Sequence, residues 1–307
     1  MSGIKATAAV GLSLALGYGG YVAIQSSRQA QELQRTQLAL ERRQARWSAL
    51  QQQIDAELLN FNGEVGLVIG DLKTGWRLTH QPERRFPSAS LVKVAIMAGY
   101  FQAVHDGHLE LGTRLRLKAA DKVSGSGVLK ERPAGSAFTV EELIGLMISE
   151  SDNTATNLLI DRLGMRYFDR YFQEIGLRQT NLARKMMDVA SRAKGVENYT
   201  TAAEVALLLE RLYRQELVSP GWSRRGLELL KQQKRRDRIP AQLPPETVVA
   251  HKTGLERYLC HDAGIVFTDQ GDFLIVVLTK SRVSSQTAKT FIATLASRAH
   301  QYIVQSR

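Results

Sequence analysis

The chain has 307 residues, a net charge of +11 and one cysteine, Cys260, with 44% hydrophobic residues. This length allows one large domain with a substantial core, and the composition excludes a disordered or collagen-like protein. A single cysteine excludes an internal disulfide and a cysteine-based metal site. Basic residues are scattered apart from residues 231–238, with no zinc-finger, RNP or basic-zipper pattern, so we expect no nucleic acid partner.

The N-terminal region contains an uncharged, apolar stretch at residues 6–24, preceded by Lys5. Its length fits a short membrane span or the apolar part of a signal peptide. No small-residue cleavage site is obvious after it, so we expect residues 1–27 to be a membrane anchor or a signal-like segment. The arginines that follow favour a cytoplasmic body by the positive-inside rule: Arg28, Arg35, Arg42, Arg43 and Arg46.

A long helix is predicted over residues 28–59, which contain neither Gly nor Pro. Apolar residues repeat there at seven-residue spacing, which allows a coiled-coil stalk. The second apolar row is patchy, so the later part of this helix is better explained by burial on a domain. We therefore expect a helical stalk at residues 28–45 and a domain at residues 46–307.

The remaining chain predicts strands and helices in a definite order. Two strands joined by a hairpin turn are followed by a mostly helical middle, then by three strands and a closing amphipathic helix. This order suggests an antiparallel sheet packed with helices, together with a helical subdomain. The expected strands are residues 64–70, 76–80, 247–253, 263–268 and 273–279, and the expected helices are residues 89–104, 140–163, 201–215 and 285–304.

The first chemical motif is Ser90-Leu91-Val92-Lys93, at the start of an apolar helix that follows Pro87. In the first helical turn, free backbone N–H groups and the helix dipole favour negative charge. Lys93 lies on the same helix face as Ser90, and a partly desolvated lysine can act as the base that a serine nucleophile needs. Alone, this motif more often marks a helix cap beside an exposed lysine than a catalytic pair.

Two further motifs have similarly ambiguous meanings when each is taken alone. Ser151-Asp152-Asn153 lies between two apolar helical runs, where it can cap the second helix and also present a hydroxyl and an amide to a cleft. His251-Lys252-Thr253-Gly254 ends a predicted strand, where Gly254 permits close approach of a substrate backbone and Lys252 can hold a carboxylate.

All three motifs occur in the order that is typical of class A β-lactamases and penicillin-binding proteins. The sequence resembles class A β-lactamases over roughly residues 46–307, most closely in residues 86–94, 148–161 and 248–254. The resemblance implies an α/β sandwich, a five-stranded antiparallel sheet flanked by helices, plus an all-helical subdomain. The α/β part then comprises about residues 46–85 and 220–307, and the helical part about residues 86–219.

The resemblance also implies roles for individual residues. Ser90 is expected to be the acylated nucleophile and Lys93 its partner in proton transfer, while Ser151 passes a proton to the leaving nitrogen. The expected substrate-binding residues are Asn153, Lys252, Thr253 and Gly254. The expected oxyanion hole consists of the N–H groups of Ser90 and Leu255. The implied activity is the opening of β-lactam rings through an acyl-enzyme, with no metal and no cofactor.

One part of the family pattern is missing from this sequence. Class A β-lactamases deacylate with a glutamate in an E-x-x-L-N loop, and no such loop occurs between Ser151 and Thr200. An ungapped count places Lys185 at the position of that glutamate. Asp188 is a possible deacylation base if the loop shifts by three residues. The alternative is a slowly deacylating penicillin-binding or D-alanyl-peptide hydrolase, or a module that binds β-lactam or peptidoglycan without turnover.

Such substrates lie outside the bacterial cytoplasm. We therefore expect an extracytoplasmic body held at the cytoplasmic membrane, in spite of the arginines after the span. The run Cys260-His261-Asp262 allows a catalytic interpretation, but we expect it to be a turn that enters the strand at residues 263–268. No other histidine has metal-ligand spacing, and no G-x-S-x-G nucleophile elbow occurs.

Overall fold

The computed structural model describes residues 3–282 and 284–305, with side chains from Arg28 onward. The chain divides into two compact units, Met1–Gln52 and Gln53–Arg307. The second unit carries the sheet and all the motifs identified above.

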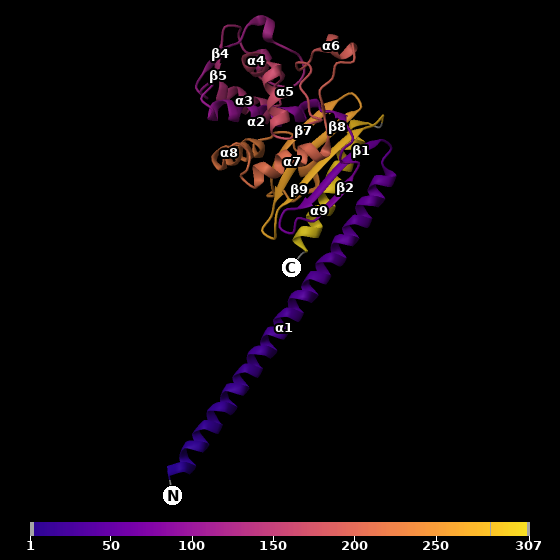
Figure 1. Cartoon of the computed structure of the whole chain (residues 1–307). Coiled ribbons are helices and arrows are strands. Elements are labelled where there is room, and N and C mark those ends of the chain that lie inside the picture. Colours follow the sequence, from indigo (N-terminus) through magenta and orange to yellow (C-terminus); the bar gives the residue numbers. More distant parts are fainter. Residues whose placement is uncertain (1–2, 283, 306–307) are drawn as a thin grey trace. The chain divides into compact units, whose positions relative to one another are not determined.

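Helix α1 (Gly3–Asn60) includes the helix predicted over residues 28–59, which is thereby confirmed (Figure 1). Its leucines at the seven-residue spacing, Leu33 and Leu40, are exposed. The predicted anchor at residues 6–24 falls outside the residues whose side chains are described. In the described part of the chain, no helix is long and apolar enough to cross a membrane.

The central sheet of the second unit has five antiparallel strands in the order β2-β1-β9-β8-β7 among the described residues. This confirms the expected fold class. The strands are β1 (Glu64–Asp71), β2 (Arg77–His80), β7 (Val248–Glu256), β8 (Leu259–Phe267) and β9 (Phe273–Lys280). The two halves of the sheet come from opposite ends of the sequence, because β1 pairs with β9 along its whole length.

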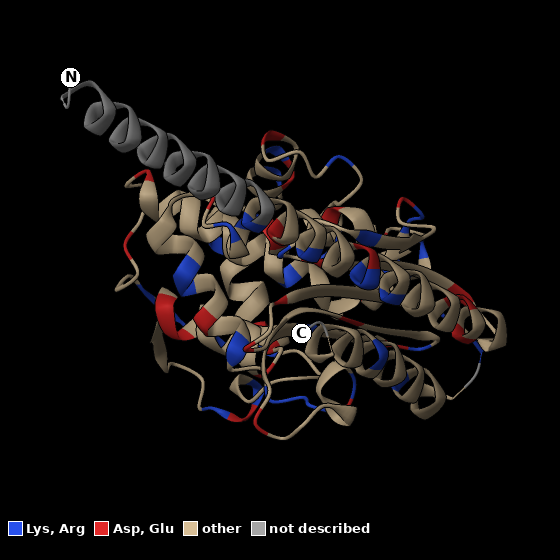
Figure 2. Cartoon of the chain, turned by 90° about the horizontal axis from the view of Figure 1, so that it is seen from below, with Lys and Arg blue, Asp and Glu red and all other residues tan. Residues whose placement is uncertain are grey.

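Helices cover both faces of this sheet, as the burial of successive strand residues requires. In β9, Val276 and Leu278 belong to the main apolar core, and the intervening Val277, equally buried, faces the opposite side. Helix α7 (Ala202–Tyr213) packs on β1 and β9, and α9 (Ser285–Val304) packs on β8 and β9. The strands between the helices are largely free of charged residues (Figure 2).

The helical part is built around α2, whose side chains are nearly all buried and which packs against other helices of this part. Its apolar composition on all sides explains this central place. The helices of this part are α2 (Val92–His105), α3 (Val140–Ser149), α4 (Asn153–Leu163), α5 (Met165–Glu174), α6 (Val189–Ala193) and α8 (Pro220–Lys231). Two small ribbons join β3 (Phe86–Pro87) to β6 (Tyr199–Thr200) and β4 (Arg114–Arg116) to β5 (Ala137–Thr139).

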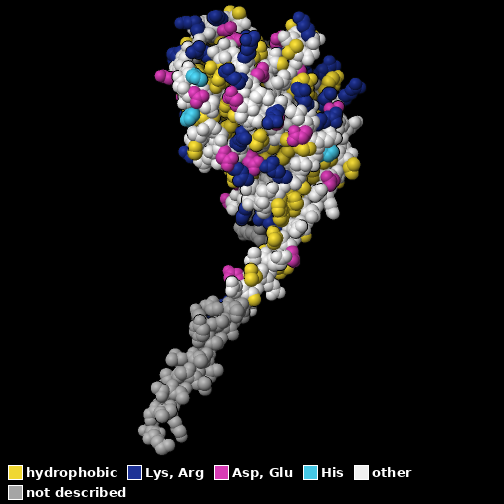
Figure 3. Space-filling model, viewed as in Figure 1, with side chains coloured by type: hydrophobic (Ala, Val, Ile, Leu, Met, Phe, Trp, Pro, Cys, Tyr) yellow, Lys and Arg dark blue, Asp and Glu magenta, His cyan; other side chains and the backbone are white. Residues whose placement is uncertain are grey.

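The connection between β7 and β8 is shorter than the sequence suggested. Tyr258 adopts a left-handed conformation with φ 67°, so the chain reverses at Arg257 and Tyr258 alone. Cys260, His261 and Asp262 consequently lie inside β8, and their assignment to a turn was wrong. On the face shown in Figure 3, Lys and Arg side chains of this unit are interspersed with acidic ones.

Candidate active site

Ser90 was expected in the first turn of the apolar helix. It lies instead in a short 3-10 turn (η1, Ala89–Leu91) immediately before α2. Ala89 has φ 45°, a conformation that residues with a Cβ rarely adopt and that marks local strain. The turn continues into α2, so the Ser90–Lys93 spacing still crosses one helical turn. Ser90 is partly exposed and lines a cavity, whereas Lys93 is fully buried beneath it.

The Lys93 ammonium group has three oxygen partners and none of them is a carboxylate. Its Nζ donates to Ser151 O at 2.7 Å, to Ser151 Oγ at 3.2 Å and to Asn153 Oδ1 at 2.8 Å. Burial lowers the pKa of Lys93 to about 7, against the smaller opposing effects of the Asp152 and Glu256 carboxylates. A substantial fraction of Lys93 is therefore uncharged at neutral pH and able to accept a proton.

Asp152 links α4 to the opposite wall of the site. Its Oδ1 accepts from Ala155 N at 2.9 Å and caps α4, which confirms the predicted helix start. Its Oδ2 accepts from Val128 N at 2.6 Å and from Leu129 N at 2.8 Å. One buried carboxylate thereby fixes both the helix and the loop at residues 124–129.

Ser151 lies at the predicted junction between the two apolar helical runs within residues 140–163. It adopts φ 56°, which costs on the order of 1–2 kcal/mol for a residue with a Cβ. This conformation separates α3 from α4 and turns the Ser151 carbonyl and hydroxyl toward the lysine. The following Asn153 donates through Nδ2 to Ser124 O at 3.2 Å, so its side chain is held at the cavity wall.

Lys252 reaches the same hydroxyl from β7. Its buried Nζ donates to Ser151 Oγ at 2.9 Å and to Thr253 O at 3.0 Å. Burial lowers the pKa of Lys252 well below its usual value, and the nearby charge of Lys93 lowers it further. Gly254 permits the close packing of β7 on η1, since a Cβ there would lie 3.2 Å from the Ala89 Cβ.

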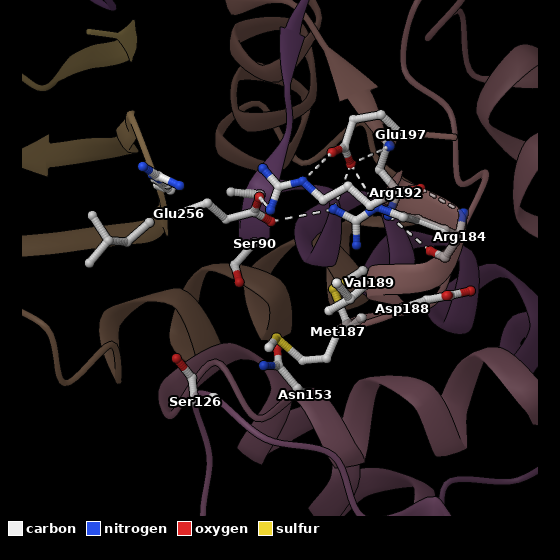
Figure 4. A pocket seen from close by; sticks show the side chains of 16 residues that line it. Ser90, Ser126, Asn153, Arg184, Met187, Asp188, Val189, Arg192, Glu197 and Glu256 are labelled. Atoms are coloured by element: carbon white, nitrogen blue, oxygen red, sulfur yellow. Dashed lines mark hydrogen bonds and ion pairs between the residues drawn. The ribbon is translucent and has the colours of Figure 1, made fainter. Parts of the chain in front are cut away.

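A cavity of about 310 Å³ opens beside Ser90 (Figure 4). Its walls are η1, the loop at residues 125–126, the segment at residues 184–198 and the end of β7. The Ser90 hydroxyl points toward the side where Ser126 and Asn153 lie. Leu255, whose N–H was expected in the oxyanion hole, also lines this cavity.

The proposed base Asp188 lines the same cavity, but its carboxylate points away from Ser90 (Figure 4). It caps α6, where Oδ1 accepts from Ser191 N at 2.9 Å and Oδ2 accepts from Ser191 Oγ at 2.7 Å. These hydrogen bonds hold the pKa of Asp188 below its usual value. This geometry does not favour Asp188 as a base for chemistry at Ser90.

The other two acids of the cavity wall are engaged by arginines (Figure 4). Arg184 Nη2 lies 2.6 Å from Glu197 Oε1; the Arg184 side chain is buried and that of Glu197 is mostly so. Arg192 Nη1 of α6 lies 2.8 Å from Glu256 Oε2 at the end of β7. Weaker pairs at 3.3 and 3.5 Å connect the four groups into one network.

An ungapped count placed Lys185 at the position of the deacylating glutamate, but the Lys185 side chain does not line the cavity beside Ser90. Lys185 forms an ion pair with Asp161. Met186 and Met187 line the cavity instead, and Met186 is only 7% exposed.

Sequence reasoning missed the residues that shape this cavity. Arg184, Arg192 and Glu256 belong to no recognisable motif, because their partners are set by the fold. Among the described residues, no group of three or more His, Cys, Asp or Glu side chains could hold a metal ion.

Comparison with known proteins matches residues 49–303 to a family described as "Beta-lactamase enzyme family". The chain is 26% identical to β-lactamase AER-1 of Aeromonas hydrophila over 248 residues, which cover 79% of this chain and 82% of that protein. A β-lactamase structure from Sphaerobacter thermophilus matches with a TM-score of 0.77 and 31% identity, covering 84% of this chain and 98% of that one. The structure of PBP-A matches with a TM-score of 0.77 and 29% identity, covering 84% and 96%.

The family match covers the whole sheet and the helical part, including Ser90, Lys93, Ser151 and Lys252. The chain therefore belongs to the β-lactamase enzyme family.

Proposed function

We propose that this protein opens β-lactam rings through an acyl-enzyme on Ser90. The observation that carries this proposal is the Ser151 hydroxyl, which accepts hydrogen bonds from both Lys93 Nζ and Lys252 Nζ. A hydroxyl has two acceptor positions and one proton. Because both acceptor positions are used, the Ser151 proton is free to point at a third group, which the leaving nitrogen of a lactam would supply.

In the proposed reaction, Ser90 Oγ bonds to the lactam carbonyl carbon and the carbon–nitrogen bond of the ring breaks. Neutral Lys93 accepts the Ser90 proton, which its lowered pKa allows near pH 7. Ser151 donates its proton to the ring nitrogen and recovers one from the adjacent ammonium group of Lys93. The N–H groups of Ser90 and Leu255 stabilise the oxyanion, and the loss of one such donor typically lowers the rate ~10²–10³-fold.

The carboxylate of the substrate is proposed to bind Lys252 and Thr253. The amide of the substrate's side chain is proposed to bind Asn153. A bound carboxylate would raise the pKa of Lys252 and favour its charged form, since opposite charges stabilise each other. Lys252 would therefore become protonated, and able to form an ion pair, when the substrate carboxylate binds.

A second candidate is a slowly deacylating penicillin-binding protein. The specific observation is that Asp188, Glu197 and Glu256, the acids that line the described cavity, all have other partners. Met186 and Met187 occupy the wall instead. A mutant of the similar protein PBP-A has a solved structure as an acyl-enzyme complex with penicillin G. In both candidates the same acyl-enzyme forms, and only its lifetime differs.

Mass spectrometry of the protein mixed with a penicillin over time tests both candidates. We expect a one-to-one adduct on Ser90 that is absent in Ser90→Ala and retained in Ser297→Ala, a serine variant on α9. Decay of the adduct with accumulation of hydrolysed penicillin supports the β-lactamase. A persistent adduct supports the second candidate, and no adduct at all contradicts both.

We further propose that the catalytic unit is extracytoplasmic and attached to the membrane by residues 6–24. β-Lactams and D-alanyl peptides are found outside the cytoplasm, which is the basis of this proposal. A C-terminal reporter that is active only in the cytoplasm would contradict it, whereas periplasmic reporter activity in the membrane fraction would support it.

A further inference from the structure

His261 is a buried side chain of β8 that contacts the segment leading to Ser90. Its Nε2 lies 2.9 Å from Pro87 O, and its Nδ1 lies 3.1 Å from Thr279 N. The ring also lies edge-on to Phe86, with centroids 6.2 Å apart. A single imidazole thus joins the central sheet to the residues before the proposed nucleophile.

These contacts determine the form of the ring. The Thr279 N–H donates to Nδ1, so the proton must be on Nε2, which donates to the Pro87 carbonyl. Burial lowers the pKa of His261 to about 4, so the imidazole is neutral near pH 7. Because Nδ1 accepts a hydrogen bond and Nε2 donates one, the two nitrogens cannot exchange places and the ring has one orientation.

The position of His261 relates the two halves of the proposed oxyanion hole. It pairs across the sheet with Gly254, which immediately precedes Leu255 on β7. Its acceptor, Pro87, lies three residues before Ser90. The hydrogen bond from His261 therefore ties the strand next to the Leu255 N–H to the segment that carries the Ser90 N–H.

The other side of the nucleophile segment is held separately. Ser88 N donates to Asn198 O at 2.7 Å, and β3 pairs with β6. The strained Ala89 lies between these contacts and Ser90, at the point where Gly254 allows close packing. Without His261, the described contacts would tie this segment to the residues 198–200 but would leave the sheet side to packing alone.

We infer that His261 is a positioning residue that sets the separation of the Ser90 and Leu255 N–H groups. This inference rests on the proposed function, because the oxyanion hole has a role only if Ser90 is acylated. His261 touches neither N–H group and acts through Pro87 and through the β7–β8 pairing.

Two polar variants separate positioning from general stability. His261→Gln keeps a donor at the reach of Nε2, toward Pro87 O. His261→Asn keeps an acceptor at the place of Nδ1, next to the Thr279 N–H, but is too short to reach Pro87. His261→Thr, a residue suited to a strand, is a second disconnecting variant if the asparagine variant does not fold. The measurements are the acylation rate constant, KM, and the infrared stretching band of the ester carbonyl in the acyl-enzyme.

We expect His261→Asn to slow acylation about tenfold with little change in KM, less than the ~10²–10³-fold loss for removal of a whole oxyanion donor. The ester carbonyl band should move to higher frequency, because weaker hydrogen bonds polarise the carbonyl less. His261→Gln should keep a rate and a band close to those of the parent protein.

An unchanged band and rate in the disconnecting variants, even with lowered thermal stability, would show that His261 is only structural. Equal losses in the glutamine and asparagine variants would also overturn the inference. Failure of the parent protein to form any adduct would instead contradict the proposed function, so the two failures are distinguishable.

Discussion

Asn157 holds the backbone of Met186 with both atoms of its side-chain amide. Its Nδ2 donates to Met186 O at 3.0 Å, and its Oδ1 accepts from Met186 N at 2.8 Å. Asn157 lies one turn after Asn153 on α4, so one helix face supports both the substrate side of the cavity and this loop. A methionine side chain is thereby fixed in the wall beside Ser90.

Replacing Met186 by glutamate should accelerate deacylation. The glutamate side chain has about the same length, and its carboxylate would enter the cavity wall, where it can activate water as a general base. We expect the adduct to decay at least tenfold faster, with the ~10²–10⁴-fold contribution typical of general base catalysis as the upper range.

The matched control for this change is Met187→Glu, whose side chain is 40% exposed and whose backbone has no hydrogen bond to Asn157 among those described. It should accelerate decay far less. Equal acceleration in both variants would indicate a general charge effect, and no change in Met186→Glu would contradict the prediction.

The acylation rate should rise with pH through about 7. Burial lowers the pKa of Lys93 to about 7, and only the neutral amine can accept the Ser90 proton. Lys93→Arg should abolish adduct formation, since a guanidinium stays protonated throughout this range. A rate that is flat between pH 5.5 and 8.5, measured by stopped-flow, would show that Lys93 is not the base.

The same lysine should make stability depend on pH. In the unfolded chain Lys93 has its ordinary pKa near 10.5, and in the folded state about 7. Between these values the unfolded state binds more protons, so stability rises with pH in this window. Lys93→Met should be inactive yet more stable at pH 7, with a Tm about 2–8 °C higher and a weaker pH dependence. A lower Tm in calorimetry would contradict this.

The sequence predicted the strands of the sheet because β1, β7, β8 and β9 have strand-like apolar runs bounded by turn residues, whereas their order within the sheet is shown by the structure. The three motifs predicted Lys93, Ser151 and Lys252 as members of one site, and these residues do meet. Here local pattern and tertiary structure agree, since each motif lies at the end of an element that the pattern already defined.

The cavity wall was not predictable in the same way. Arg192 and Glu256 are far apart in the sequence, and their pairing depends on where α6 and the end of β7 meet. His261 was assigned to a turn because a left-handed Tyr258 has no sequence signal comparable to that of glycine. Its role follows from the contact with Pro87, which only the folded chain shows.

Asp152→Ala should destabilise the fold more than a usual helix cap does. The carboxylate accepts from three backbone N–H groups, of Ala155, Val128 and Leu129, and is 1% exposed. Truncation would leave these donors without partners, and we expect a loss of about 2–4 kcal/mol in the free energy of unfolding. Urea denaturation measures it.

Asp188→Ala is the control for this prediction, because Asp188 caps the short helix α6 through Ser191. It should lower the free energy of unfolding clearly less than Asp152→Ala does, as expected for a single helix cap on the surface. Similar losses for the two aspartates would show that the contacts of Asp152 to residues 128 and 129 contribute little.

The ion pair between Arg192 and Glu256 should restrict the acyl side chains that fit the cavity. It joins α6 to the end of β7 in the wall of the cavity, and the Arg192 side chain is 41% exposed. Its contribution to stability is therefore small, about 0.2–1 kcal/mol, and screened by salt.

Glu256→Gln should raise the acylation efficiency of a bulky oxyimino cephalosporin relative to benzylpenicillin by about threefold to tenfold, equivalent to about 0.7–1.4 kcal/mol. Glu210→Gln, which breaks the pair with Arg77 away from the cavity, should leave this ratio unchanged. An equal ratio of acylation efficiencies in the parent protein, Glu256→Gln and Glu210→Gln would contradict the prediction. If adding Arg192→Gln to Glu256→Gln raises the ratio by the same factor again, the two residues do not act as one barrier.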